Sequence, residues 1–215
     1  MYEYNKSPEE IYRLSFHRVE MALQPYLQAK PVDEAMLPII MRMVHACGMP
    51  DLLQDMMWSK QFLPVALAEL PTLKTIFVDS HMVKEGIIQK FLSPSVKLTC
   101  TLQDESVPAL ARLMGNTRSA AGLELWPHDE IAQSAIVIGN APTALFHLLE
   151  RIEAGIMPEP KFIIGMPVGF VGAAESKQAL MEFPFHSSEW ITIQGTRGGS
   201  AIAAAALNAL AKLHQ

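Results

Sequence analysis

The feature that most constrains this chain of 215 residues is a unit of apolar strand, glycine-rich loop and helix that occurs three times in succession. Each unit begins with an almost wholly apolar run, at residues 135–138, 162–164 and 190–194. The loops that follow are residues 139–143, 165–172 and 195–200. Strands without polar alternation are typical of a parallel sheet that is buried on both faces. We therefore predict one α/β domain over residues 1–215, with a mostly parallel sheet and helices on both faces.

The first half of the chain predicts further strands at residues 75–78 and 96–101. The first helix should start at the N-cap Ser7, with Pro8 at its first position, and end near Leu23, before a linker at residues 25–31. The other predicted helices are residues 33–48, 64–70, 81–90, 144–153, 173–181 and 201–213, with shorter ones starting near residues 51 and 119.

Charge and cysteine content exclude several classes of protein. Half of the residues are hydrophobic and 18% are charged, as in a compact globular protein, and the net charge of −5 provides no basic surface for nucleic acid. Two cysteines are too few for a disulfide framework or a thiolate metal site. The N-terminus has no signal-peptide pattern, and no apolar run is long enough to span a membrane. We expect a soluble, cytoplasmic protein without a membrane partner.

The three glycine-rich loops point to one rim of the predicted sheet. Ligands of open α/β sheets bind beyond the carboxyl ends of the strands. Each loop meets a helix N-terminus, where free N–H groups and the helix dipole attract anions. A single glycine-rich loop needs no explanation beyond a tight turn. Three such loops at one rim also fit a wide anion-binding crevice, so both interpretations stay open.

The predicted helix at residues 33–48 carries His45 in its last turn, three residues after Arg42 and on the same side. The negative end of the helix dipole favours a protonated imidazole there. A hydrogen-bonded structural histidine and a proton donor are both compatible with this position. The residues alone leave the choice open.

Common cofactor and catalytic motifs are missing. Gly165, Gly169 and Gly172 are spaced too widely for a dinucleotide fingerprint, and Lys177 lies inside a predicted helix and not in a phosphate loop. The sequence has no Gly-x-Ser-x-Gly and no paired histidines of the metalloprotease type. We therefore predict neither a metal site nor a bound cofactor.

Several stretches together resemble the precorrin-8X methylmutase family, in the same order and over essentially the whole chain. They are residues 11–16 (IYRLSF), 42–48 (RMVHACG), 115–118 (GNTR), 138–146, 164–177 and 198–201. The stretch at residues 165–177 is too long for chance agreement, whereas the loop between Trp190 and Gly198 follows the family less closely.

This resemblance implies an isomerase of corrin biosynthesis. Its reaction moves a methyl group from carbon 11 to carbon 12 of precorrin-8X or cobalt-precorrin-8, giving hydrogenobyrinate or cobyrinate. The resemblance also implies a homodimer that needs no added cofactor, with His45 as the catalytic residue and with Ser15 and Arg42 in contact with the substrate. Whether the substrate carries cobalt is left open.

The residues suit such a substrate, a flat apolar ring edged with carboxylates. Arg42 and Arg118 can each pair with a carboxylate. We expect the loops to add substrate contacts from Asn140, Gly165, Gly169, Gly172 and Ser200. An alternative is a tetrapyrrole carrier that binds the ring without converting it. His45 distinguishes the two, because a carrier has no need of an acid at that position.

Overall fold

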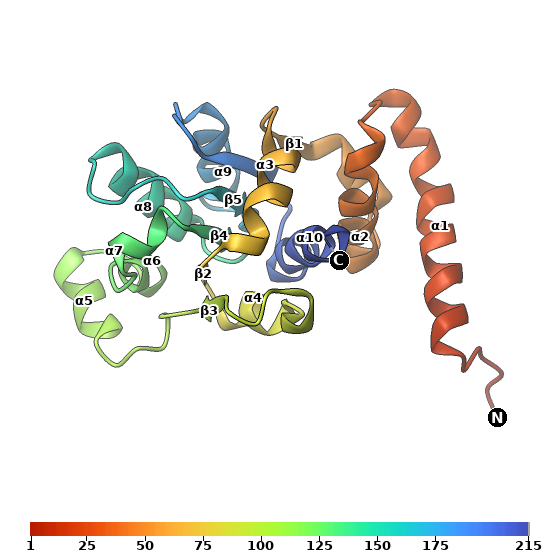
Figure 1. Ribbon diagram of the computed structural model, residues 1–215, viewed down its shortest axis with the longest axis horizontal. Helices are drawn as coiled ribbons and strands as arrows, with labels where there is room; N and C mark the ends of the chain where they lie inside the picture. Colours follow the sequence, from red (N-terminus) through yellow and green to blue (C-terminus); the bar gives the residue numbers. More distant parts are fainter. Residues whose placement is uncertain (215) are drawn as a thin grey trace.

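A computed structural model describes residues 1–214 of the chain (Figure 1). Its centre is a six-stranded sheet with the strand order β1-β6-β5-β4-β2-β3. The strands are β1 Met56–Trp58, β2 Thr75–Val78, β3 Lys97–Thr99, β4 Ser134–Ile138, β5 Phe162–Gly165 and β6 Glu189–Ile193. β2, β3, β4, β5 and β6 pair in parallel, and β1 pairs with β6 in the antiparallel direction at one edge. The predicted α/β fold with a mostly parallel sheet is confirmed.

Helices cover both faces of this sheet. The α-helices are α1 Pro8–Ala29, α2 Leu37–Cys47, α3 Phe62–Glu69, α4 His81–Gly86, α5 Val107–Met114, α6 Arg118–Leu123, α7 His128–Ile131, α8 Pro142–Glu153, α9 Ala173–Glu182 and α10 Ser200–Leu213. Short 3₁₀ turns are η1 Glu34–Met36, η2 Pro50–Asp55, η3 Leu70–Thr72 and η4 Gln89–Phe91. Figure 1 shows α2 and α10 on one side, α8 and α9 on the other, and α1 as the outermost helix. Within residues 1–214, no helix combines the length and apolarity needed to cross a bilayer.

The buried strands supply both cores. Every residue of β2, β4 and β5 is buried. In β2, Ile76 and Val78 pack into the core under α2, α3 and α10, whereas Phe77 packs into the core under α8 and α9. This two-residue alternation follows from the pleat of a strand. Burying each side chain of this size stabilises the folded state by about 1.5–3 kcal/mol. Because these side chains point alternately to the two faces, the same short strands stabilise both helical layers.

The order in which strands are added to the sheet reverses at β2, because β3 lies on one side of β2 and β4 and the later strands lie on the other. The buried Asp79 follows β2 at this point. Its carboxylate accepts the backbone N–H groups of Gly139, Asn140 and Ala141 at 3.0, 2.9 and 2.7 Å. Burial raises the pKa of Asp79, and the three N–H groups oppose that rise. This carboxylate therefore ties the end of β2 to the loop that leads into α8.

Some boundaries differ from the prediction. The linker predicted at residues 25–31 is wrong, because α1 continues through Pro25 to Ala29 and closes with a 2.8 Å bond from the Lys30 N–H to the Tyr26 carbonyl. A proline near the end of a helix removes only one hydrogen bond, which the helix tolerates. The helix predicted at residues 81–90 ends at Gly86, and neither β1 nor α5 was predicted.

Glu159 fixes the turn that precedes β6. Its carboxylate accepts the backbone N–H groups of His186, Ser187 and Ser188 at 2.9, 2.7 and 3.0 Å. Burial alone would raise the pKa of Glu159, but the hydrogen bonds from His186 and Ser187 lower it to about 2. The ionised carboxylate thus stabilises the folded chain.

We predict that this stabilisation is present above the ordinary glutamate pKa of 4.5 and is lost as the pH falls from there to about 2. The shift corresponds to at most about 3 kcal/mol. Urea unfolding should show that Glu159→Gln lowers the free energy of unfolding at pH 6 and that the difference shrinks near pH 2. Glu153→Gln, at an exposed position at the end of α8, is the control and should change little. An equal deficit at both pH values would contradict this assignment.

Candidate active site

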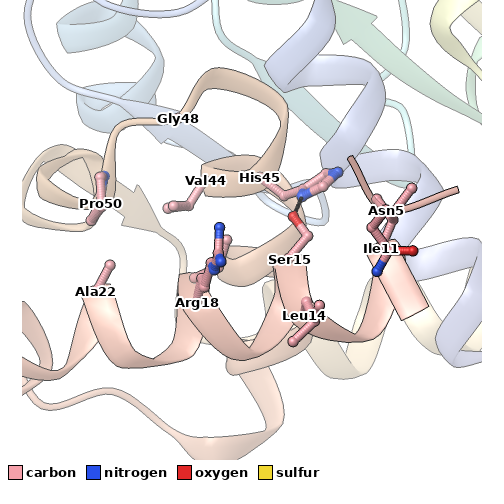
Figure 2. Close-up of a pocket in the computed structure, with 11 residues that line it drawn as sticks. Asn5, Ile11, Leu14, Ser15, Arg18, Ala22, Val44, His45, Gly48 and Pro50 are labelled. Carbon is pink, nitrogen blue, oxygen red and sulfur yellow. Dashed lines mark hydrogen bonds between the residues drawn. The ribbon is translucent and has the colours of Figure 1, made fainter. Parts of the chain in front are cut away.

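His45 and Ser15 meet where α1 lies along α2 (Figure 2). α2 ends at Gly48, whose left-handed backbone (φ 71°) lets its N–H bond the Val44 carbonyl at 2.7 Å. This stop leaves His45 in the last turn of α2. The Ser15 hydroxyl on α1 lies 3.0 Å from His45 Nδ1. Two residues that are 30 positions apart in the sequence are therefore joined by a hydrogen bond.

The His45 ring is exposed but held on two sides. It stacks on Phe16 with ring centres 4.9 Å apart and an angle of 21° between the planes. The Ser15 hydroxyl occupies Nδ1, and no hydrogen bond from the described residues reaches Nε2. Nε2 is therefore the ring nitrogen that a ligand can reach.

A cavity of about 520 Å³ opens beside this pair, between α1 and the end of α2. Its walls are mostly apolar, with a few polar side chains. The lining residues are Asn5, Ile11, Leu14, Ser15, Arg18, Val19, Ala22, Val44, His45, Gly48 and Pro50. Apolar walls with a few placed polar groups are typical of a small-molecule site.

Two arginines flank the His45 pair. Arg42 donates to the Tyr12 hydroxyl at 3.0 Å, and its guanidinium carbon lies 5.0 Å from the centre of the Phe16 ring. Arg18 lines the cavity and was not predicted, although it follows Ser15 by three residues and so shares its side of α1. Within residues 1–214, neither arginine forms an ion pair with a carboxylate. Both can receive an anionic ligand.

Arg118 and Asn140 line a different cavity of about 610 Å³. It lies at the N-terminus of α6, where the Thr117 side chain caps the helix and its hydroxyl is 2.8 Å from that of Thr143. The other lining residues are Leu102, Gln103, Asp104, Glu105, Pro108, Thr117 and Ser119. A single chain therefore brings His45, Ser15 and Arg42 together but leaves Arg118 and Asn140 in a separate pocket.

Much of the backbone of the glycine-rich loops already contacts other parts of the protein, so fewer N–H groups are free for a ligand than the sequence suggested. The N–H groups of residues 139–141 already donate to Asp79 and are not free for a ligand. Gly165 lies in the core, where an added Cβ would be 2.6 Å from Leu180 Cδ2. Gly169 lines a third cavity of about 220 Å³, and Ser200 lies 3.5 Å from the Ser80 hydroxyl at the start of α10. Gly172 precedes α9.

Charges in the last loop pair with the protein itself. Arg197 forms ion pairs with Asp51 and Asp55 of η2, which raise its pKa. Lys177 of α9 is buried, and its ammonium group donates a hydrogen bond to the Arg197 carbonyl. Burial lowers the pKa of Lys177 to about 8. These cations hold the loop in place. No cluster of three or more His, Cys, Asp or Glu side chains in the described chain is arranged to bind a metal.

Comparisons with known proteins agree over nearly the whole chain. A family model described as precorrin-8X methylmutase matches residues 10–213. A precorrin-8X methylmutase of Pseudomonas aeruginosa is 44% identical over 211 residues, which cover 98% of each chain. A cobalt-precorrin-8 methylmutase of Methanothermobacter thermautotrophicus is 37% identical over 181 residues, or 83% of this chain and 81% of that one. The solved precorrin-8X methylmutase from Thermus thermophilus matches with a TM-score of 0.81, 30% identity and 96% coverage of both chains.

Gly198 sits against the backbone of the preceding loop and allows no side chain. A Cβ added there would lie 2.4 Å from the Met166 carbonyl oxygen. We predict that Gly198→Ala lowers the free energy of unfolding by about 2–4 kcal/mol, since backbone must move to admit it. Gly195→Ala is the matched control, with φ +76° but nothing within 4 Å, and should cost only about 1 kcal/mol. Equal losses in urea unfolding would show that the close contact does not matter.

Proposed function

The chain belongs to the precorrin-8X methylmutase family, and from this premise we propose how its residues carry out the methyl migration. The family reaction is an isomerisation in cobalamin biosynthesis. We propose that the cavity beside His45 receives the macrocycle. The observation that carries this proposal is the Ser15–His45 hydrogen bond at the edge of an apolar cavity.

In this proposal His45 acts as a general acid. Moving a methyl group within a conjugated ring shifts electron density, and a proton lent to the ring lowers the barrier. The imidazolium gives its proton from Nε2 while the methyl group moves and takes it back afterwards, so that atoms and electrons balance. A rearrangement of this kind is redox-neutral, and we therefore propose that it needs no metal or nucleotide.

Ser15 and Phe16 would position that acid. The Ser15 hydroxyl can accept a hydrogen bond from Nδ1–H both in the imidazolium and in the neutral imidazole that remains once Nε2 has given up its proton. The stack with Phe16 restricts rotation of the ring. The same nitrogen then faces the substrate before and after proton transfer.

The substrate's carboxylates require several separate donors. We propose that Arg18 and Arg42 pair with carboxylates near His45, because both are free of acidic partners in the described chain. Further contacts are proposed from Gly169, Gly172 and Ser200, together with Arg118 and Asn140. For Gly165 and the N–H groups of the 139–141 loop, packing and Asp79 already account for the local geometry.

A homodimer would explain why these donors lie in separate pockets. Two apolar surfaces support it: α1 exposes Ile11 (47%) and Met21 (60%), and the tip of the loop before α9 exposes Phe170 (95%) and Val171 (88%). We propose that a second copy covers these surfaces and brings its Arg118 pocket toward His45.

We propose precorrin-8X without cobalt as the preferred substrate, since two relatives named for it are 44% identical, whereas a relative named for cobalt-precorrin-8 is 37% identical. The proposed compartment is the cytoplasm, because Cys47 and Cys100 are free thiols, which reducing compartments maintain.

We predict that His45→Asn lowers kcat by about 100- to 10,000-fold with little change in substrate binding, because asparagine keeps polarity but donates no mobile proton. Chelator-treated enzyme should be assayed by single-turnover absorbance, with precorrin-8X or cobalt-precorrin-8 as the sole addition. An unchanged rate in the variant would refute the acid role, and binding without conversion by the wild type would favour a carrier.

We predict that light scattering gives twice the mass of one chain. Phe170→Asp should shift the protein toward monomer and reduce activity per chain, because a charge in an apolar interface must be desolvated without a partner. Leu113→Asp is the matched control, since Leu113 is also exposed (84%) but lies on α5. A wild type that stays monomeric at micromolar concentration would contradict the homodimer.

A further inference from the structure

The Tyr12 hydroxyl holds two cations at once. Arg42 Nη2 donates to it at 3.0 Å, and Lys212 Nζ donates to it at 3.1 Å. The two cations also lie near the ring itself, with the guanidinium carbon 5.6 Å and the ammonium nitrogen 5.0 Å from its centre. Burial alone would raise the pKa of Tyr12, but the Lys212 hydrogen bond and the nearby charges lower it overall. One uncharged phenol oxygen therefore accepts hydrogen bonds from two positively charged side chains.

No acidic side chain balances these charges. In the described part of the chain, neither Arg42 nor Lys212 has a carboxylate within ion-pair distance. By contrast, Arg151 is paired with Glu124, and Arg197 is paired with Asp51 and Asp55. The result is a local excess of positive charge on a protein whose net charge is −5.

The pair lines its own cavity of about 320 Å³ next to the one beside His45. Its lining residues are Tyr12, Phe16, Pro38, Met41, Arg42, Ala209, Lys212 and Leu213. The two cavities adjoin at the aromatic stack, since His45 lines one, Phe16 lines the other and their ring centres are 4.9 Å apart. A ligand that lay over His45 and reached past the Phe16 ring would therefore enter the cavity that Lys212 lines.

The position of Lys212 is set by the core. It lies in the last turn of α10, directly after Ala209, Leu210 and Ala211, which are buried, and α10 packs along α2. Because α2 also carries Arg42 and His45, the ammonium group has a defined place relative to both. The Tyr12 hydroxyl holds it there.

We propose that Lys212 is a substrate-binding residue that, with Arg42, seats one peripheral carboxylate of the macrocycle. The carboxylate would take over the two donors that Tyr12 holds in the free protein. A carboxylate adds a Coulomb attraction to both cations that the neutral phenol oxygen does not supply, so this exchange favours binding. The inference rests on the proposed function for the identity of the ring and adds a residue beyond those already assigned.

The test measures binding of hydrogenobyrinate by absorbance titration, in the free-acid form and as its methyl ester. Lys212→Met keeps the length of the side chain and removes the charge, and Lys212→Arg keeps the charge. Lys60→Met is the control, an exposed lysine in the turn after β1 that lines none of these cavities. Lys212 is exposed at the end of a helix, so each variant should fold, which circular dichroism checks.

We expect Lys212→Met to weaken binding of the free acid roughly fivefold to twentyfold and to leave ester binding unchanged. Lys212→Arg should stay within about twofold of the wild type, as should Lys60→Met. Equal affinity of Lys212→Met and wild type for the acid would overturn the proposal. So would an equal loss for acid and ester, which would mean that Lys212 acts through packing. If the wild type binds the acid with this charge dependence but never converts precorrin-8X, the proposed function fails and the carboxylate site stands.

Discussion

The buried carboxylate of Asp79 is the interaction on which the arrangement of this molecule depends. It lies between β2 and β4, the point in an open parallel sheet where ligands usually bind, and it already occupies the N–H groups at the start of α8. An anionic substrate would find this position taken by an anion that belongs to the protein. Arg197 and Lys177 are likewise committed, to Asp51, Asp55 and a backbone carbonyl. Arg18, Arg42 and Lys212 have no acidic partner in the described chain and lie instead on α1, α2 and α10, so the proposed site is built on helices and not on the loops at the sheet edge.

Because the proposed site lies on helices, it depends on how α1 packs against α2. α2 is fixed by its packing against α10, which itself packs on the sheet, and Ile39, Ile40, Met43 and Val44 of α2 are buried. α1 has little core of its own and lies at the outside of the molecule (Figure 1). Its position is therefore set by a few contacts with α2 and η2, and one of them is the hydrogen bond to His45. The proposed acid, His45, is thus anchored on a well-packed helix, while Ser15 and Phe16, proposed to orient it, come from a helix with far less support.

The strands that are buried on both faces could be predicted from the sequence, because a short, wholly apolar run such as residues 135–138 is typical of such a strand. The resemblance and helical spacing also pointed to His45, Ser15 and Arg42, which the structure places close together, and their roles stay predictions. The sequence could not supply β1, whose three residues are held by pairing with β6 more than 130 positions away. Nor could it show that Asp79 takes the N–H groups of a loop 60 residues later. Arg18 could have been found, since it follows Ser15 at helical spacing.

The magnitudes explain why so modest a constellation suffices for the proposed chemistry. General acid catalysis contributes about 100- to 10,000-fold, which corresponds to about 3–5 kcal/mol. Fixing a reactant in one geometry can contribute about 7–11 kcal/mol. A migration within one molecule has no second reactant to bring in, so positioning here means holding a wide ring flat and at one rotation over Nε2. Apolar walls alone cannot define that rotation, because they do not distinguish one edge of the ring from another. Cations placed at separate points around the rim can, and this is the arrangement that Arg18, Arg42 and Lys212 form around His45.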